Sequence, residues 1–484
     1  MCIRDSLLSA AATAATAATG ASDGAALEAG LAAVREEHIA ADVHFLADDV
    51  MGGRDTPSLG LELSARYIRA RLQRLGFEPG ARGASFFHTY RLERRPLDFG
   101  RTRVEVQPAS GPGRTLRYGG EYLFYPGGTV DWTLAGGVVY CGSGTAEECA
   151  AGELDGRWAL CLDDGGLGWR ERRENARGAG ALGVISVQPV DSPEPTYGER
   201  FAGWTAMARS GGLRLAGLAP DEDERSYPYL NFSREAGAEL LGGGAPPAAG
   251  TVLDVRVTDV RATAGGETFE AENVCGWWPG SDPVLRKEAI VISAHYDHVG
   301  TRDRQIYNGA DDNASGSAGL LALAEGLAAY GPMRRSVLLL WVSGEEKGLL
   351  GSDAWARSPW LPGQSRAVAN VNIDMIGRNA PDKLLITPTA ALPQHNGLVR
   401  LADRLAPDEG FGPLGSCDEY WFRSDHASFS QHLEIPVTFL FADVHEDYHE
   451  PTDTADKVDF DKIRRVMRLV LAMLDGLQGD SLDI

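Results

Sequence analysis

The sequence predicts an α/β protein with a mostly parallel or mixed sheet and helices on both faces. From Thr251 onwards, short apolar stretches of strand length alternate with longer stretches of helical apolar spacing. This alternation is typical of a wound parallel sheet. Polar and acidic residues follow several of these strands, at the strand ends where such folds bind ligands. A preceding section of short strands punctuated by glycine predicts a small β-rich inserted domain.

Length and charge exclude several classes of protein. A chain of 484 residues with 43% apolar and 24% charged residues is long enough for two or three globular domains. It carries 46 basic against 68 acidic residues, a net charge of −22, which argues against a nucleic-acid partner. No stretch of apolar residues is long enough for a transmembrane helix. Six cysteines are too few for a disulfide framework, and none is spaced as a thiolate zinc site.

The first hundred residues divide into a leader and a helical region. Residues 1–24 are rich in alanine and threonine and resemble a signal peptide, so we expect an exported protein, periplasmic or secreted. A disordered leader is the alternative. Helical apolar spacing then covers 38–50 and 61–75. These two helices cannot bury a core alone, so region 25–99 should pack on a later domain.

Residues 100–250 form the predicted insert. Three apolar strands, at 137–141, 158–162 and 182–187, are the clearest, with a helix at about 170–178 between the last two. The section ends in GGGAPPAAG, which has the composition of a linker.

Residues 251–484 form the predicted catalytic domain. The apolar run at 289–294 is too short for a globular helix and predicts a buried strand. A helix at 314–330 ends at a Gly-Pro pair. Further elements are strands at 336–342, 368–373 and 435–441 and an amphipathic helix at 462–477.

Histidines and acids follow four strands of this domain. Because the carboxyl ends of parallel strands meet at one edge, we expect these side chains to lie together. Imidazole with carboxylate is the ligand set of zinc, with manganese or cobalt as possible substitutes. The set is too large for one tetrahedral ion and suits two ions that share a bridging carboxylate. The residues are His295, Asp311, Glu345, Glu346, Asp374 and His449.

Glu345 and Glu346 are adjacent, and extended neighbours point to opposite sides. One can bind metal while the other acts as general base. Their spacing alone does not decide which.

Five motifs in this region resemble one family. The motifs, in chain order, are HYDH, NGADDNASG, SGEEKGLLGS, NIDMIGR and YHEPTDT. Their order and spacing over Thr251–Leu477 resemble the co-catalytic di-zinc aminopeptidases, a family that also includes the glutamate carboxypeptidases. In the middle section, ELDGRWALC and NARGAGALGVISV resemble a protease-associated domain.

The resemblance implies a role for each site residue. Glu345 would be the general base, and Asp297 would orient His295. The family's oxyanion tyrosine is replaced by Trp421, so Tyr420 or Tyr448 would have to substitute. The implied metal ligands are His295 and Asp374 on one zinc, Glu346 and His449 on the other, and Asp311 between them, with a cis bond to Asp312. His298 is expected to be a loop residue or a residue that supports a ligand, rather than a ligand itself.

Three main functions and one minor one therefore remain open. The first is an aminopeptidase that hydrolyses N-terminal residues of peptides with two Zn²⁺ ions per chain. The second is a carboxypeptidase of the glutamate type, which needs a basic pocket for the substrate carboxylates. The third is a catalytically inactive receptor or binding protein on the same fold; a cyclising acyltransferase is a minor fourth option.

Overall fold

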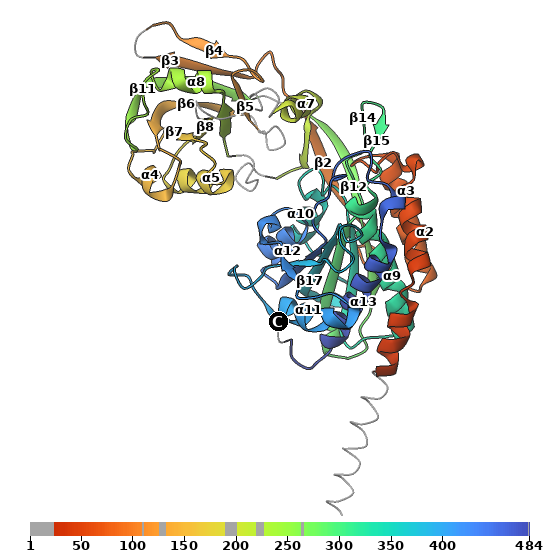
Figure 1. Cartoon of the computed structure of the whole chain (residues 1–484). Helices are drawn as coiled ribbons and strands as arrows, with labels where there is room; N and C mark the ends of the chain where they lie inside the picture. The colour runs from red at the N-terminus through yellow and green to blue at the C-terminus, as the bar shows by residue number, and fades with distance from the viewer. Residues whose placement is uncertain are drawn as a thin grey trace, which may run out of the picture. The chain divides into compact units, whose positions relative to one another are not determined.

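The computed structural model describes residues 24–108, 111–124, 132–188, 201–218, 227–262, 266–482 and 484 (Figure 1). The chain forms two compact units, Met1–Tyr90 with Glu270–Ile484, and Arg91–Phe269. The predicted leader lies outside the described residues, except for its last residue, Gly24. Its signal-peptide character stays a prediction.

Four parallel strands form the centre of the first unit. They are β13 (Glu288–His295), β16 (Ser336–Val342), β17 (Arg366–Asp374) and β20 (Val437–Phe441), in the order β20-β17-β13-β16. Antiparallel strands flank them, β12 (Glu267–Trp278) beside β16 and β18 (Leu385–Thr387) beside β20. The sheet is therefore mixed, and the predicted α/β class is confirmed.

The register of the strand pairs aligns the C-terminal ends of these four strands. His295 pairs with Val342, and Asp374 pairs with Phe441. Ser293 lies beside Asn372, two residues before His295 and Asp374 respectively. The carboxyl ends of all four parallel strands thus meet at one edge, as the sequence predicts.

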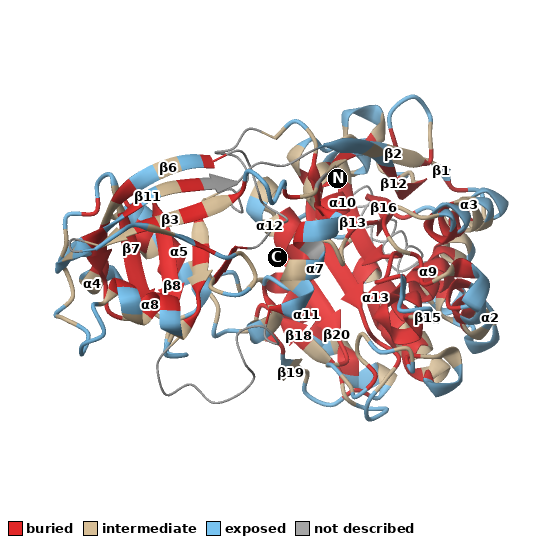
Figure 2. Cartoon of the chain, turned by 90° about the horizontal axis from the view of Figure 1, so that it is seen from above, coloured by how far each residue is buried: buried red, intermediate tan, exposed pale blue. Residues whose placement is uncertain are grey.

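Helices cover both faces of this sheet because the side chains of β13 alternate between two cores. Ile290 and Ile292 face a core with α2 (Glu36–Leu46), α9 (Gly316–Tyr330) and α13 (Phe460–Gly476). Ala289 and Val291 face the opposite core. There α10 (Leu350–Arg357) and α12 (His426–Leu433) contribute Trp355 and Phe429. The central strands are almost wholly buried (Figure 2).

The N-terminal helices belong to this unit. α2 and α3 (Leu59–Arg74) contribute Val43, Ile68 and Leu72 to the larger core. The remaining elements of the unit are β1 (Glu78–Pro79), β2 (Phe87–Arg95, which continues into the second unit), β14 (Thr301–Arg302), β15 (Gln305–Ile306), β19 (Gly415–Ser416), α11 (Gly397–Leu405) and the short helices Asp49–Met51, Leu285–Lys287, Pro362–Gln364, Ala406–Glu409, Asp418–Tyr420 and Ala455–Lys457.

Arg54, between α2 and α3, joins this helical region to the loops at the strand ends. Its guanidinium is fully buried and donates hydrogen bonds to the carbonyl oxygens of Tyr296 (2.9 Å), Asn308 (2.7 Å) and Gly309 (2.9 Å). A buried guanidinium needs such acceptors to offset its desolvation. Arg54 thereby fixes the loop after β13 and the loop before α9 against each other.

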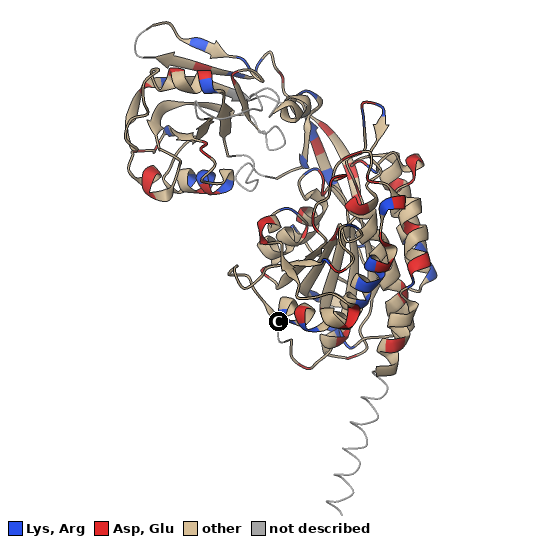
Figure 3. Cartoon of the chain, in the orientation of Figure 1, with Lys and Arg blue, Asp and Glu red and all other residues tan. Residues whose placement is uncertain are grey.

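Charged side chains lie on the outer helices (Figure 3). On α13, Arg464 and Arg465 pair with Asp461, and Arg468 pairs with Glu409. Among the residues that the structure describes, every helix is too short or too polar to cross a membrane.

The second unit has its own sheet and core. Its strands follow the order β4-β3-β11-β6-β7-β8-β10-β5. The predicted strands are present as β6 (Trp132–Tyr140), β7 (Arg157–Leu162) and β8 (Gly183–Val187), with α5 (Trp169–Gly178) before β8. The other elements are β3 (Arg103–Pro108), β4 (Arg114–Leu116), β5 (Tyr122–Phe124), β9 (Gly212–Leu215), β10 (Tyr229–Phe232), β11 (Val252–Ala262), α4 (Ala146–Ala150), α7 (Ala202–Ser210) and α8 (Arg234–Leu240).

The boundaries of this unit differ from the predicted 100 and 250. β11 pairs with β3 and with β6 and so belongs to the insert rather than to the catalytic domain. The glycine-rich stretch taken for a linker is a loop between α8 and β11 inside the unit. Composition identified the loop correctly but could not show that one more strand returns to the same sheet.

Candidate metal centre

One group of possible metal ligands lies where β13 and β17 end. His295 Nε2 lies 3.1 Å from Asp374 Oδ1 and 3.4 Å from Asp312 Oδ1. All three residues are buried. The other ring nitrogen of His295 lies 3.1 Å from the backbone carbonyl oxygen of Asp297, which leaves Nε2 as the acceptor nitrogen when Nδ1 carries the proton.

A second group lies beside the first. His449 Nε2 lies 3.1 Å from Asp312 Oδ2 and 3.1 Å from Glu346 Oε2. His298 Nδ1 lies 2.8 Å from Glu346 Oε1 and 3.7 Å from Asp312 Oδ2. Burial opposes ionisation of Glu346, but the imidazoles of His298 and His449 hold the pKa of its carboxyl well below the ordinary value.

Asp312 belongs to both groups. Its Oδ1 faces His295, whereas its Oδ2 faces His449 and His298. A carboxylate that offers one oxygen to each of two neighbouring groups is the arrangement that a bridging ligand requires.

The structure therefore corrects the prediction for Asp311. Its carboxylate belongs to neither group, accepts a 2.6 Å hydrogen bond from the Gly377 backbone N–H and lies 3.2 Å from His445 Nε2. The cis bond joins Asp312 to Asn313, one residue later than expected. Because adjacent side chains point in different directions, motif order alone could not decide between the two aspartates.

His298 lies in the loop after β13, as predicted, and its side chain is fully buried within the second group. A signal was available in the sequence, because His298 follows His295, the last residue of β13, by three residues.

The two groups fit zinc. Bonds of about 2.0–2.1 Å from a tetrahedral Zn²⁺ place neighbouring ligand atoms about 3.4 Å apart. The separations within the two groups, 3.1–3.4 Å around His295 and 2.8–3.7 Å around Glu346, bracket that value. Imidazole nitrogens and carboxylate oxygens are donors that zinc accepts. Several of them, including His298 Nδ1 and Glu346 Oε1, are buried without a hydrogen-bond partner among the described residues.

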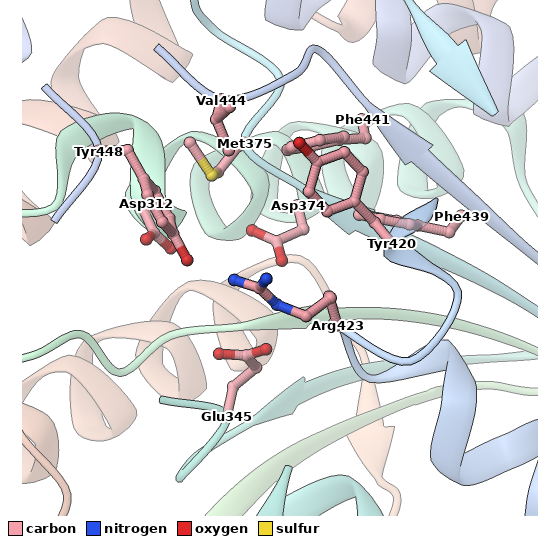
Figure 4. Close-up of a pocket in the computed structure, with 10 residues that line it drawn as sticks. All are labelled: Asp312, Glu345, Asp374, Met375, Tyr420, Arg423, Phe439, Phe441, Val444 and Tyr448. Atoms are coloured by element: carbon pink, nitrogen blue, oxygen red, sulfur yellow. The ribbon is translucent and has the colours of Figure 1, made fainter. Parts of the chain in front are cut away.

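Glu345 lies next to these groups but belongs to neither. Its carboxylate points into a pocket whose lining includes Asp312 and Asp374 (Figure 4). Burial raises the pKa of Glu345 well above its ordinary value, opposed by the charge of His295. A carboxylate with a raised pKa is suited to take up and release a proton near neutral pH.

Asp297 contacts Glu345 as well as His295. Its Oδ1 accepts a 3.2 Å hydrogen bond from the Glu345 backbone N–H and lies 3.7 Å from His295 Nδ1. Its Oδ2 accepts a 3.1 Å bond from the Thr56 hydroxyl. Asp297 thus lies where the sequence predicts, although its backbone carbonyl is closer to the His295 ring than its carboxylate.

The pocket beside the carboxylates is lined by both charged and apolar side chains. Figure 4 shows the Arg423 guanidinium among the side chains of Glu345, Asp374 and Asp312. Tyr448, whose ring stacks on His449 with centroids 3.9 Å apart, lies on the same pocket wall as Asp312. The remaining lining residues are Met375, Tyr420, Phe439, Phe441 and Val444.

Trp421 is not among the pocket-lining residues. Its indole is buried against the ring of His426, with centroids 5.1 Å apart, in the second core of the unit. Burial raises the pKa of Tyr448 far above its ordinary value, so its hydroxyl keeps its proton. Both candidate tyrosines, Tyr420 and Tyr448, line the pocket.

Comparisons with known proteins agree with this site. Residues 273–474 match Peptidase family M28. A "Probable leucine aminopeptidase" of Arthroderma otae is 30% identical over 207 residues, which cover 39% of this chain and 54% of that protein. A "Probable glutamate carboxypeptidase" of Arabidopsis thaliana is 30% identical over 209 residues, which cover 39% of this chain and 28% of that protein. The chain thus spans about half the length of the leucine aminopeptidase.

A solved structure shares the fold. The aminopeptidase from Aneurinibacillus sp. strain AM-1 aligns with a TM-score of 0.57 at 21% identity, over 94% of this chain and 96% of that one. This likeness concerns the fold, and the match of residues 273–474 to Peptidase family M28 agrees with the resemblance carried by the five motifs.

Proposed function

We propose that this chain, which carries a Peptidase family M28 domain at residues 273–474, is an aminopeptidase that uses two zinc ions. The observation that supports this most strongly is the Asp312 carboxylate, whose two oxygens face two different groups of ligand side chains. His295 and Asp374 would hold one ion, and Glu346 and His449 the other. Glu345 is left free for proton transfer.

Each residue around the pocket then has a separate role in hydrolysis. Bound zinc would polarise the scissile carbonyl and lower the pKa of a water molecule. Glu345 takes a proton from the attacking water and returns it to the leaving amine. Asp297 holds the backbone of Glu345 in place. The Tyr448 hydroxyl donates a hydrogen bond to the oxygen on which negative charge develops.

The pocket supports a preference for an apolar N-terminal residue. Met375, Phe439 and Phe441 form an apolar wall beside the carboxylates. This wall would accept the apolar side chain of the substrate's first residue.

Arg423 supports a second candidate, a carboxypeptidase. Its guanidinium lies in the same pocket and could pair with a substrate carboxylate. Arg423 is the one basic residue among the described residues that line the pocket, and the rest of the wall is apolar or acidic. The aminopeptidase is therefore the better supported of the two.

The remaining assignments concern the whole chain. We propose that the second unit is a protease-associated domain, on the strength of its motifs and its separate β-rich core. We also propose export, on the strength of the leader sequence. Detection of the leader-free protein outside the cytoplasm of cells that express the whole chain would test the latter.

A matched pair of peptides tests the proposed activity. The protein is incubated with an unblocked peptide that begins with leucine and with its N-acetylated twin, with and without a chelator, and the products are weighed by mass spectrometry. Loss of N-terminal residues from the free peptide alone, stopped by the chelator, is the expected result. Trimming of both peptides from the C-terminus would favour the carboxypeptidase, and no cleavage at all with added zinc would favour a binding protein.

A further inference from the structure

We infer that His298 is a third histidine ligand of the metal centre and binds the same ion as Glu346 and His449. The inference rests on the proposed two-zinc centre and adds a ligand that the family resemblance does not supply. It makes the two ions unequal, because one would have two imidazole ligands and the other only one.

The first argument is that the His298 ring lacks partners. The ring is fully buried, and neither Nδ1 nor Nε2 has a hydrogen-bond partner among the described residues. Leaving buried polar atoms unpaired is costly, so such atoms indicate a missing partner. His295 differs in this respect, because its Nδ1 is already engaged by the Asp297 carbonyl.

The second argument is the contact between His298 and Glu346. Nδ1 lies 2.8 Å from Glu346 Oε1, yet the two atoms are not aligned as a hydrogen bond, and Oε1 also has no such partner. When Nδ1 of neutral His298 carries no proton, it and Glu346 Oε1 are two acceptor atoms that repel each other. A cation that both atoms bind removes this conflict, because each lone pair then points at the ion.

The third argument is that the four side chains converge. Asp312 Oδ2 lies 3.7 Å from His298 Nδ1 and 3.1 Å from His449 Nε2, which lies 3.1 Å from Glu346 Oε2. Two nitrogens and two carboxylates at these separations are a complete donor set for a tetrahedral ion. The group around His295 offers one nitrogen and two carboxylates, which leaves a position open.

Unequal donor sets predict unequal ions. Nitrogen-rich sites suit zinc, whereas oxygen-rich sites also accept manganese. The group with His298 should therefore bind the first zinc ion and hold it tightly. The group with His295 should bind its ion more weakly and exchange it for Mn²⁺ more readily.

Zinc titration against a competing chelator tests this on the whole chain. The unchanged protein should show a tight step and a weaker step. His298→Phe should weaken the tight step at least about 100-fold, because removal of a group that merely supports a ligand already costs about 10–100-fold. The weaker step should keep its affinity in this variant, whereas His295→Phe should weaken that step instead.

His298→Asn separates a ligand from a hydrogen-bond donor. The amide of asparagine can donate to Glu346 as a protonated Nδ1 would, but it is a poor zinc ligand. An affinity as low as that of His298→Phe supports the inference. Recovery of the tight step in His298→Asn, or an unchanged tight step in His298→Phe, would overturn it.

Cobalt provides a readout that needs no variant. In the Co²⁺-loaded protein, each bound imidazole gives one strongly shifted, exchangeable N–H resonance in the proton NMR spectrum. Three such resonances are expected, from His295, His298 and His449, and two would overturn the inference. A protein that binds two zinc ions but cleaves no peptide would refute the proposed aminopeptidase and leave this result standing, whereas a protein that binds no zinc would refute both.

Discussion

The Asp297 carboxylate accepts a 3.2 Å hydrogen bond from the backbone N–H of Glu345. This bond joins the loop after β13 to the loop after β16 and therefore couples the segment that carries His295 to the one that carries the proposed base. Thr56 adds to the connection, because its hydroxyl donates to Asp297 and accepts from the Gly344 backbone N–H. Asp297 thus positions two functional groups at once.

Removal of this carboxylate should slow turnover without emptying the site. In Asp297→Ala the Glu345 backbone loses its acceptor, and a small displacement of a catalytic group can lower the rate by about 100-fold. Zinc content measured by elemental analysis should stay near two per chain. Asp297→Asn keeps an oxygen that can accept the bond, so it should recover much of kcat; equal loss in both variants would contradict a positioning role.

Glu345→Gln should remove the general base. The amide keeps the size and hydrogen-bonding capacity of the side chain but cannot take up a proton. Peptide hydrolysis should fall by about 10²–10⁴-fold in kcat. Because Glu345 belongs to neither ligand group, zinc content should not change. Undiminished turnover in Glu345→Gln would show that another residue is the general base.

Asp311→Asn and Asp312→Asn should behave differently although the residues are adjacent. Asp311 accepts from the Gly377 backbone, and an asparagine can keep that bond, so both zinc ions should remain. Asp312→Asn has only one oxygen and cannot serve both groups. Zinc affinity, measured by competition with a chelator, should fall at least about 100-fold. Loss of a residue that only hydrogen-bonds to a metal ligand already lowers metal affinity by about 10–100-fold. The opposite order would restore Asp311 as the bridging residue.

Tyr448→Phe should lower kcat, whereas Tyr420→Phe serves as the matched control. Both rings line the pocket, but Tyr448 stacks on His449 beside Asp312, and Tyr420 packs on Phe441. Loss of one donor to a developing oxyanion costs about 10²–10³-fold. A large effect in Tyr420→Phe with little in Tyr448→Phe would assign the role to Tyr420.

His426 should make folding sensitive to acid. Burial between Trp421 and Phe439 lowers the pKa of its imidazole to about 3, from an ordinary 6.5. Between these values the unfolded chain binds more protons than the native protein, so the free energy of unfolding falls as the pH falls. The contribution is at most about 1.4 kcal/mol per pH unit.

His426→Phe should therefore show a smaller loss of stability on acidification than the unchanged protein. Urea unfolding of both proteins in the same series of buffers, from near neutral to acid pH, measures the difference. Parallel curves would show that His426 does not titrate on unfolding.

Much of the fold could be predicted from the sequence because the central strands are buried on both faces. The strand predicted at 336–342 matches β16 residue for residue, and that at 289–294 differs from β13 by one residue at each end. Continuous apolar runs of this length have few alternatives. The convergence of the site followed from the same pattern, because parallel strands place their carboxyl ends together.

What the sequence could not supply is the direction of individual side chains. Asp311 and Asp312 are neighbours of one type, and only the turn before α9 decides that Asp312 faces the histidines. His298 follows His295 by three residues, which places it near the site, but this spacing does not show that its side chain turns toward Glu346. The return of β11 to the sheet of the second unit was missed for a similar reason, since pairing between strands far apart in sequence leaves no local signal.

Anomalous diffraction at the zinc absorption edge, from crystals of the zinc-loaded protein, tests the central claim most directly. The account predicts two peaks, one on each side of the Asp312 carboxylate. One should be bound by His295 and Asp374, and the other by Glu346, His449 and His298. A single peak, or a pair of peaks bridged by Asp311, would contradict it.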